Sequence, residues 1–145
     1  MLLAVGILVV LIIVIGFGGM VYDERKVDKQ NKLAGDLEKA IAIGDLRGVD
    51  SAIEQGVDVN KRLSNDTTAL VFTIENKASI EIFRAIINAG AWTHAGKKND
   101  TLLMVAIINR VNPDVVKMLL QAGADPNEKG GFGSSALTKA VQQDS

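Results

Sequence analysis

The chain of 145 residues has no cysteine and a single histidine. Without cysteine it can form no disulfide, no thiolate zinc site and no thiol nucleophile, although both reducing and oxidising compartments remain compatible. The lone histidine has no second histidine or cysteine with which to build a metal site. The formal net charge of -1 also lacks the basic excess of nucleic-acid-binding proteins. We therefore expect no catalytic residues, no cofactor, no metal and no nucleic-acid partner.

Charged side chains are also missing from residues 1–22, MLLAVGILVVLIIVIGFGGMVY. As a helix at about 1.5 Å per residue, this run would extend roughly 33 Å and cross the hydrocarbon core of a bilayer. The alternative is a cleaved signal peptide, which would need a basic start, a shorter apolar core and a small-residue cleavage site. None of these is evident, so the run predicts a single transmembrane helix that contacts the lipid bilayer.

Basic residues follow this run but do not precede it. The positive-inside rule therefore places the rest of the chain in the cytoplasm, with a periplasmic location as the alternative. Residues 23–35, DERKVDKQNKLAG, contain no proline and predict a charged juxtamembrane stalk. We expect this stalk to continue the membrane helix as far as Gly35, with Asp36 capping the next helix.

Residues 36–145 repeat one pattern at a nearly fixed interval. The three glycines that mark it, Gly56, Gly90 and Gly123, are separated by 34 and 33 residues, and each ends an amphipathic segment of ten residues. A second short apolar helix precedes each segment, and Thr68 and Thr101 stand where a hydroxyl can cap it. A fixed period of this length indicates stacked helical repeats.

The repeated unit resembles the ankyrin repeat, in which Thr-Pro-Leu-His opens the first helix and Gly-Ala-Asp-x-Asn follows the second. The resemblance rests on DTLLMVA with DVVKMLLQAGADPN, on DTTALVF with EIFRAIINAGA, and on LEKAIAIGD with GVDVN. It implies an all-α ankyrin repeat solenoid of three full repeats and a C-terminal half repeat, preceded by a single transmembrane helix. The implied boundaries are residues 36–65, 66–98, 99–131 and 132–145, in a small bacterial-type protein with an N-terminal membrane anchor.

The sequence departs from the family pattern in the first helices and at both ends. Alanine or leucine replaces the proline, and Val71, Met104 and Thr138 replace the histidine, so the side-chain network of that histidine is in doubt. Terminal repeats need a polar outer face. The polar positions expected to close the two ends are Gly48, Ser51 and Gln55, then Gln142, Gln143, Asp144 and Ser145.

Candidate partner-binding residues lie on the first helices and in the loops. In the repeat frame, Val71, Phe72, Met104 and Val105 fall on the exposed face of the first helices, where apolar side chains favour a partner over solvent. The loop candidates are Trp92, Lys97, Lys98 and Phe132. For Trp92 the alternative is packing under the hairpin, for Phe132 docking onto the third unit, and for the lysines plain solubility.

Two other loop features have structural interpretations. His94 takes the place held by Asn60 and Asn127 in the other repeats, where a side chain bonds the neighbouring hairpin. The stretch GGFGSS, residues 130–135, lacks the Lys-Ser/Thr ending of a phosphate-binding loop and is interpreted as a turn.

Together these features predict a membrane-anchored ankyrin repeat protein that acts as a non-enzymatic scaffold or adaptor for a protein partner. Two alternatives stay within the binding class. One is a membrane-held immunity or inhibitor protein that neutralises a toxin or lipase. The other is a structural subunit of a membrane complex.

Overall fold

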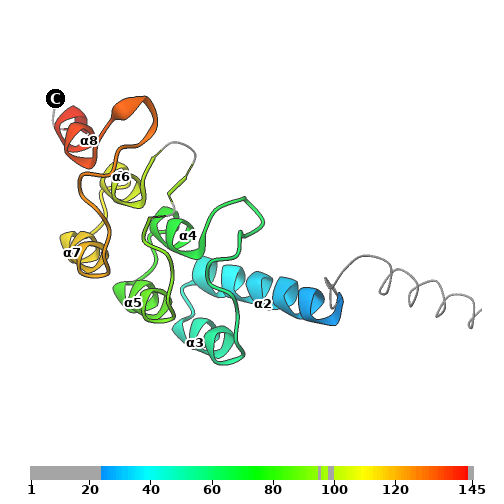
Figure 1. The fold of residues 1–145 in the computed structure, drawn as a ribbon. Helices are drawn as coiled ribbons and strands as arrows, with labels where there is room; N and C mark the ends of the chain where they lie inside the picture. Colours follow the sequence, from blue (N-terminus) through cyan, green and yellow to red (C-terminus); the bar gives the residue numbers. More distant parts are fainter. Residues whose placement is uncertain (1–23, 95, 98–99, 144–145) are drawn as a thin grey trace, which may run out of the picture.

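The computed structural model describes residues 24–94, 96–97 and 100–143, and in these ranges the regular secondary structure is helical except for one isolated bridge between Lys97 and Asp100 (Figure 1). The helices are α2 (Glu24–Ile43), α3 (Leu46–Glu54), α4 (Ala69–Glu75), α5 (Ile80–Asn88), α6 (Leu102–Ile108), α7 (Pro113–Gln121), the short 3-10 helix η1 (Gly131–Gly133) and α8 (Ala136–Gln143). The expected transmembrane helix at residues 1–22 lies outside the described residues. Within them, no helix combines the length and the apolar character needed to span a bilayer.

The helices form pairs that stack side by side into two rows. Helices α2, α4, α6 and α8 contact one another in sequence in the first row, while α3, α5 and α7 form the second (Figure 1). The loops that lead from one pair to the next project from the first row, on the side away from the second (Figure 1). This arrangement confirms the expected all-helical repeat stack.

Capping residues fix where the short helices begin. The hydroxyl of Thr68 accepts a hydrogen bond from the backbone amide of Val71, and that of Thr101 accepts one from Met104, each at 3.4 Å. Both bonds confirm the expected threonine caps. The hydroxyl of Ser79 caps α5 in the same way, by accepting from the amide of Ile82 at 3.4 Å.

The start of α5 also carries a perturbed carboxylate. Hydrogen bonds from its own backbone amide and from the side chain of Ser79 lower the pKa of Glu81 below the usual 4.5, and the nearby Arg84 acts in the same direction. Desolvation opposes these effects only in part. Glu81 therefore stays ionised at the helix N-terminus, where a negative charge is favourable.

Helix α2 differs from the expected stalk. It runs without a break from Glu24 to Ile43, so the expected helix end at Gly35 and cap at Asp36 are wrong. Gly35 lies on the exposed side of the helix, where a single glycine is tolerated. Leu33 and Ala34 are buried against the stack, so the C-terminal part of the expected stalk belongs to the fold.

Polar contacts extend this docking towards the N-terminal half of α2. The amide group of Gln30 donates to the carbonyl of Gly56 at 2.8 Å, and its oxygen accepts from the backbone amide of Asp58 at 2.9 Å. The ammonium of Lys61 donates to Asn31. The first exit loop is therefore tied to α2.

The N-terminal pair packs closely through a glycine. A Cβ built on Gly48 would lie 2.7 Å from the Asp45 carboxylate and 2.9 Å from the Cβ of Ala40. Gly48 is thus a contact point between α2 and α3, and not only part of a polar outer face. Ser51 and Gln55 do remain exposed, as expected for a terminal repeat.

The last described helix, α8, exposes both polar and apolar side chains. Gln142 is exposed and the amide of Gln143 donates to the Ile108 carbonyl at 3.0 Å. However, Leu137 is 74% exposed on the same helix, α8. Of the residues expected to close this end, Gln142 is exposed and Gln143 is half-buried, and Asp144 and Ser145 lie outside the described residues.

Candidate partner-binding surface

The loop that follows each second helix, called here the exit loop, is built on an Asp-x-Asn turn in the first and third repeats. The carboxylate of Asp58 accepts from the backbone amide of Asn60 at 2.9 Å, and that of Asp125 accepts from Asn127 at 2.8 Å. A carboxylate that bonds the backbone two residues on stabilises a tight turn. The aspartates are therefore explained by local structure.

The first exit loop also bonds the second. The Asn60 amide group donates to the Gly90 carbonyl at 3.1 Å, and its oxygen accepts from the Trp92 backbone amide at 2.7 Å. This bears out the expected role of the asparagine position. Between the second and third exits, in the part of the chain that the structure describes, the Thr93 hydroxyl donates a longer hydrogen bond to the Ala122 carbonyl, at 3.5 Å.

The second exit loop replaces the Asp-x-Asn pair with two rings. Trp92 stands at the aspartate position and His94 at the asparagine position, and their rings stack with centroids 5.6 Å apart and planes inclined by 22°. The side chain of Trp92 is 55% exposed, so it does not pack under the hairpin. The loop therefore presents a half-exposed aromatic surface where the first and third repeats place turn-forming polar groups.

A backbone bridge closes the second exit loop. The amide of Lys97 donates to the Asp100 carbonyl at 3.1 Å, and the amide of Asp100 donates back at 3.0 Å. A Cβ on Gly96 would lie 1.8 Å from the Asp100 carbonyl oxygen, so only glycine fits there. The ammonium of Lys97 pairs with Glu75 of α4. Lys97 therefore holds the loop against the stack, and Lys98 lies outside the described residues.

The third exit loop carries a fully exposed aromatic ring. Phe132 has a left-handed backbone, with φ at 61°, and its side chain is 104% exposed. It therefore does not dock onto the third unit. The ring lies at the edge of a hollow of about 590 Å³ that also includes Asp100 and Lys139, themselves paired at 3.6 Å.

A family comparison fits this repeated geometry. The family described as ankyrin repeats, in three copies, matches residues 37–130. The chain belongs to the ankyrin repeat family. Ankyrin repeats are generally protein–protein interaction modules without catalytic activity. Within the described residues, no group of three or more His, Asp or Glu side chains could hold a metal ion.

Curated relatives share the repeats over part of their length. The chain is 37% identical over 114 residues to E3 ubiquitin-protein ligase hecd-1 of Caenorhabditis elegans, covering 74% of this chain and 4% of that protein. It is 29% identical over 95 residues to ankyrin repeat, SAM and basic leucine zipper domain-containing protein 1 of Eulemur macaco macaco, covering 63% of this chain and 20% of that protein. The chain thus spans a small fraction of the relatives it matches.

The ankyrin stack corrects three of the expected surface residues. Val71 and Met104 are fully buried and Val105 is 5% exposed, so the expected exposure of these side chains is wrong. They occupy the first turns of α4 and α6, where adjacent first helices pack against each other. Phe72 is partly buried and packs against the same core.

The exposed candidates that remain are Trp92, which replaces the aspartate of the exit motif, and Phe132, which lies in the glycine-rich turn after the third exit motif. Trp92 and Phe132 were expected on sequence grounds, and their binding role stays a prediction. The expected structural role of His94 takes the form of a ring stack on Trp92. The sequence feature that predicts this stack is the position of His94 two residues after Trp92, where the first and third exits have an Asp-x-Asn pair. We call Trp92, His94 and Phe132 the exit-loop surface.

Proposed function

We propose that this chain is a membrane-anchored ankyrin repeat protein that acts as a non-enzymatic scaffold or adaptor and binds a protein partner through the exit-loop surface. The observation that carries the proposal is the half-exposed Trp92 ring, held by its stack on His94. Its loop is further fixed by the bond from the Trp92 amide to Asn60. A large ring held in one position loses little entropy on binding, and tryptophan is frequent among residues that dominate binding energy.

The membrane part of the proposal rests on sequence. Residues 1–22 carry no charge and are followed by Arg25, Lys26, Lys29 and Lys32. By the positive-inside rule we propose a single-pass anchor in the cell membrane with the repeats in the cytoplasm. Activity of a periplasm-specific reporter fused after Ser145 would contradict this orientation and place the repeats in the periplasm. If the chain still sediments with membranes after deletion of residues 1–22, the proposal that these residues anchor it is refuted.

The binding proposal is tested by capture with the full chain and two matched variants. Trp92→Ala removes the exposed ring, whereas Arg84→Ala shortens an exposed side chain in the second row. For a ring at the centre of an interface, capture should weaken at least about 30-fold in the first variant and stay unchanged in the second. Equal capture by all three proteins would refute the exit-loop surface. A captured toxin or lipase would favour the inhibitor alternative.

A further inference from the structure

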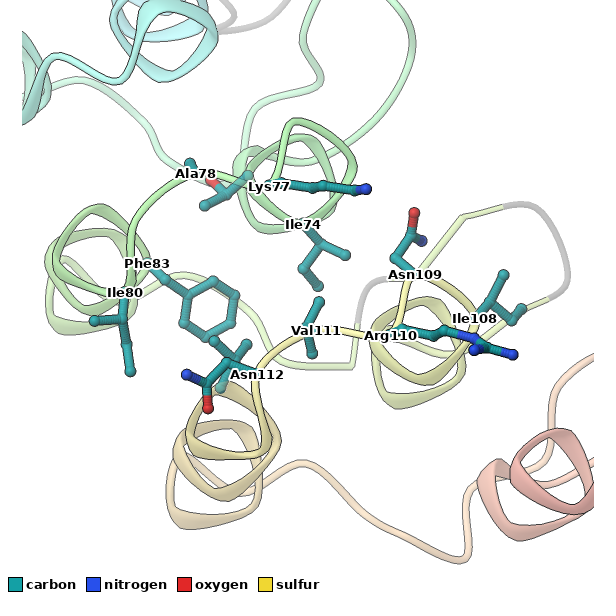
Figure 2. A pocket seen from close by; sticks show the side chains of 12 residues that line it. Ile74, Lys77, Ala78, Ile80, Phe83, Ile108, Asn109, Arg110, Val111 and Asn112 are labelled. Atoms are coloured by element: carbon teal, nitrogen blue, oxygen red, sulfur yellow. The ribbon is translucent and has the colours of Figure 1, made fainter. Parts of the chain in front are cut away.

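A second hollow lies away from the exit loops, at the turns inside the second and third repeats. The turn from α4 to α5 and the turn from α6 to α7 border a cavity of about 670 Å³ (Figure 2). These turns follow the ends of α4 and α6, whereas the capping threonines and exit loops precede the same helices. The cavity, called here the turn groove, is within the size range of ligand pockets.

The floor of the turn groove is apolar. Ile74 and Phe83, each 2% exposed, form its base, and the partly exposed Val111 adds to it. Figure 2 shows these three side chains directed towards the middle of the groove. An apolar side chain of a ligand would therefore meet hydrocarbon on several sides.

The rim of the turn groove is positively charged. Lys77 and Arg110 are exposed, line the groove, and leave their turns in the same direction (Figure 2). In the described part of the chain neither side chain forms an ion pair or hydrogen bond. Among the residues that the structure describes, no aspartate or glutamate lines the groove. The nearest carboxylates along the chain are already engaged or lie outside it: Glu75 pairs with Lys97, and Glu81 and Asp114 belong to the first turns of α5 and α7.

The two cations occupy equivalent and strained backbone positions. Lys77 has φ at 51° and Arg110 at 50°, and the corresponding residue of the first repeat is Gly44 with φ at 73°. All three close the same turn, since each backbone amide bonds the carbonyl three residues earlier, at 2.9–3.1 Å. Left-handed backbone at this place favours glycine. Lysine and arginine therefore stand at these two turns at the cost of backbone strain.

The spacing of the cations selects the shape of the ligand. Equivalent positions in successive units are separated by about 8–10 Å, the distance between packed helices. Two carboxylates three residues apart in an extended, polyproline-like peptide lie about 9 Å apart on the same side. A lone carboxylate headgroup would neutralise one cation and leave the other.

We propose that the turn groove binds an extended, acidic segment of a partner protein, with an apolar side chain on the groove floor between two carboxylates that meet Lys77 and Arg110. The proposal rests on the proposed function as an interaction module, but it assigns a second surface and a ligand chemistry. It requires no contribution from Trp92 or Phe132, so the two surfaces can be tested separately.

The test is an NMR titration of the full chain, held in a zwitterionic detergent, with the synthetic peptide Gly-Glu-Leu-Pro-Glu-Gly. We expect saturable shifts of the backbone amides of Lys77, Arg110 and Val111. The matched Gly-Gln-Leu-Pro-Gln-Gly peptide should bind at least about tenfold more weakly, because it lacks the charges. Added salt should weaken binding of the acidic peptide, since salt screens interactions between exposed charges.

Glycine variants remove the charge without threatening the fold. Lys77→Gly and Arg110→Gly place at each turn the residue that Gly44 already provides, so stability should hold or rise. Each change should weaken the acidic peptide about tenfold, while the exchanged pair Lys77→Arg with Arg110→Lys should retain binding.

Several outcomes would overturn the proposal. Equal binding of the glutamate and glutamine peptides, or unchanged shifts in the double glycine variant, would show that the cations select nothing. If only the signals of Trp92 and Phe132 shift, the peptide binds the exit-loop surface and the turn groove is not its binding site. If decanoate shifts the amide signals of the groove residues but the peptide does not, the ligand of the groove is a small anionic amphiphile and not a peptide segment. If the chain dimerises in a concentration-dependent way and the glycine variants do not, the occupant of the groove is a second copy of this chain.

Discussion

Asn60→Ala tests the bond network that holds the Trp92 loop. The change removes two hydrogen bonds, from the Asn60 amide to the Gly90 carbonyl at 3.1 Å and from the Trp92 amide to the Asn60 oxygen at 2.7 Å. A net contribution near 1 kcal/mol per bond, reduced by solvent exposure, gives a loss of about 1–2 kcal/mol in the free energy of unfolding. Urea denaturation measures this difference directly.

Asn127→Ala is the matched control. Asn127 holds the same place in the third exit loop, but in the described part of the chain its side chain makes no hydrogen bond; only its backbone amide does, to Asp125 at 2.8 Å. Both variants lose the same residue type from the same kind of turn. The difference between their unfolding free energies therefore isolates the two bonds of Asn60.

Fluorescence gives a second readout, because Trp92 is the sole tryptophan of the chain. Loss of the Asn60 bonds should free the Trp92 loop, shift its emission to longer wavelength and increase acrylamide quenching. Asn127→Ala should leave the spectrum unchanged. Equal destabilisation by the two variants, with unchanged Trp92 emission in both, would refute the view that Asn60 fixes the aromatic surface.

Three further predictions follow from packing and charge. Gly48→Ala should destabilise by about 1–3 kcal/mol in urea because its Cβ meets α2, whereas Gly35→Ala, with nothing within 4 Å, should stabilise by about 0.5–1 kcal/mol. Met104→Ala should cost about 2–5 kcal/mol, as expected for a fully buried side chain and not for a surface contact. The lowered pKa of Glu81 stabilises the fold above its usual value of 4.5, and this contribution is lost as the pH falls further. Stability of Glu81→Gln should therefore fall less on acidification over that window, and parallel curves for both proteins would contradict this.

The repeat frame was readable from sequence because it depends on local chemistry. Thr68 and Thr101 cap their helices through a bond between near neighbours, and the glycines Gly56, Gly90 and Gly123 have φ values of 82°, 87° and 92°, as a helix exit requires. Such features depend on a few adjacent residues. The period therefore predicted both the order of the helices and their stacking.

The errors concern contacts between units. Val71, Met104 and Val105 lie on very short helices that are apolar nearly all round, so the pattern gives no exposed face. Their burial is decided by the neighbouring repeats. Likewise, Gly35 does not end α2, because Ala34 before it and Leu37 after it are both buried in the stack.

The junction between the second and third repeats differs from the junction before it. Among the described residues, Asn60 gives the first junction two hydrogen bonds between exit loops, while Thr93 gives the second junction one bond at 3.5 Å. The turn groove lies at this second junction. In a linear stack the stability of each unit depends on its neighbours, so a weak junction opens first.

Hydrogen exchange of the unliganded chain should show this order. Amides of α6 and α7 should exchange faster than those of α4 and α5, because the third repeat can separate without breaking the Asn60 bonds. Asn60→Ala should bring the two sets closer together, since it weakens the more stable junction. A groove ligand that contacts both turns should slow α6 and α7 more than α4 and α5. Uniform exchange across the four helices, unaffected by the substitution, would show that the loop hydrogen bonds do not control how the stack opens.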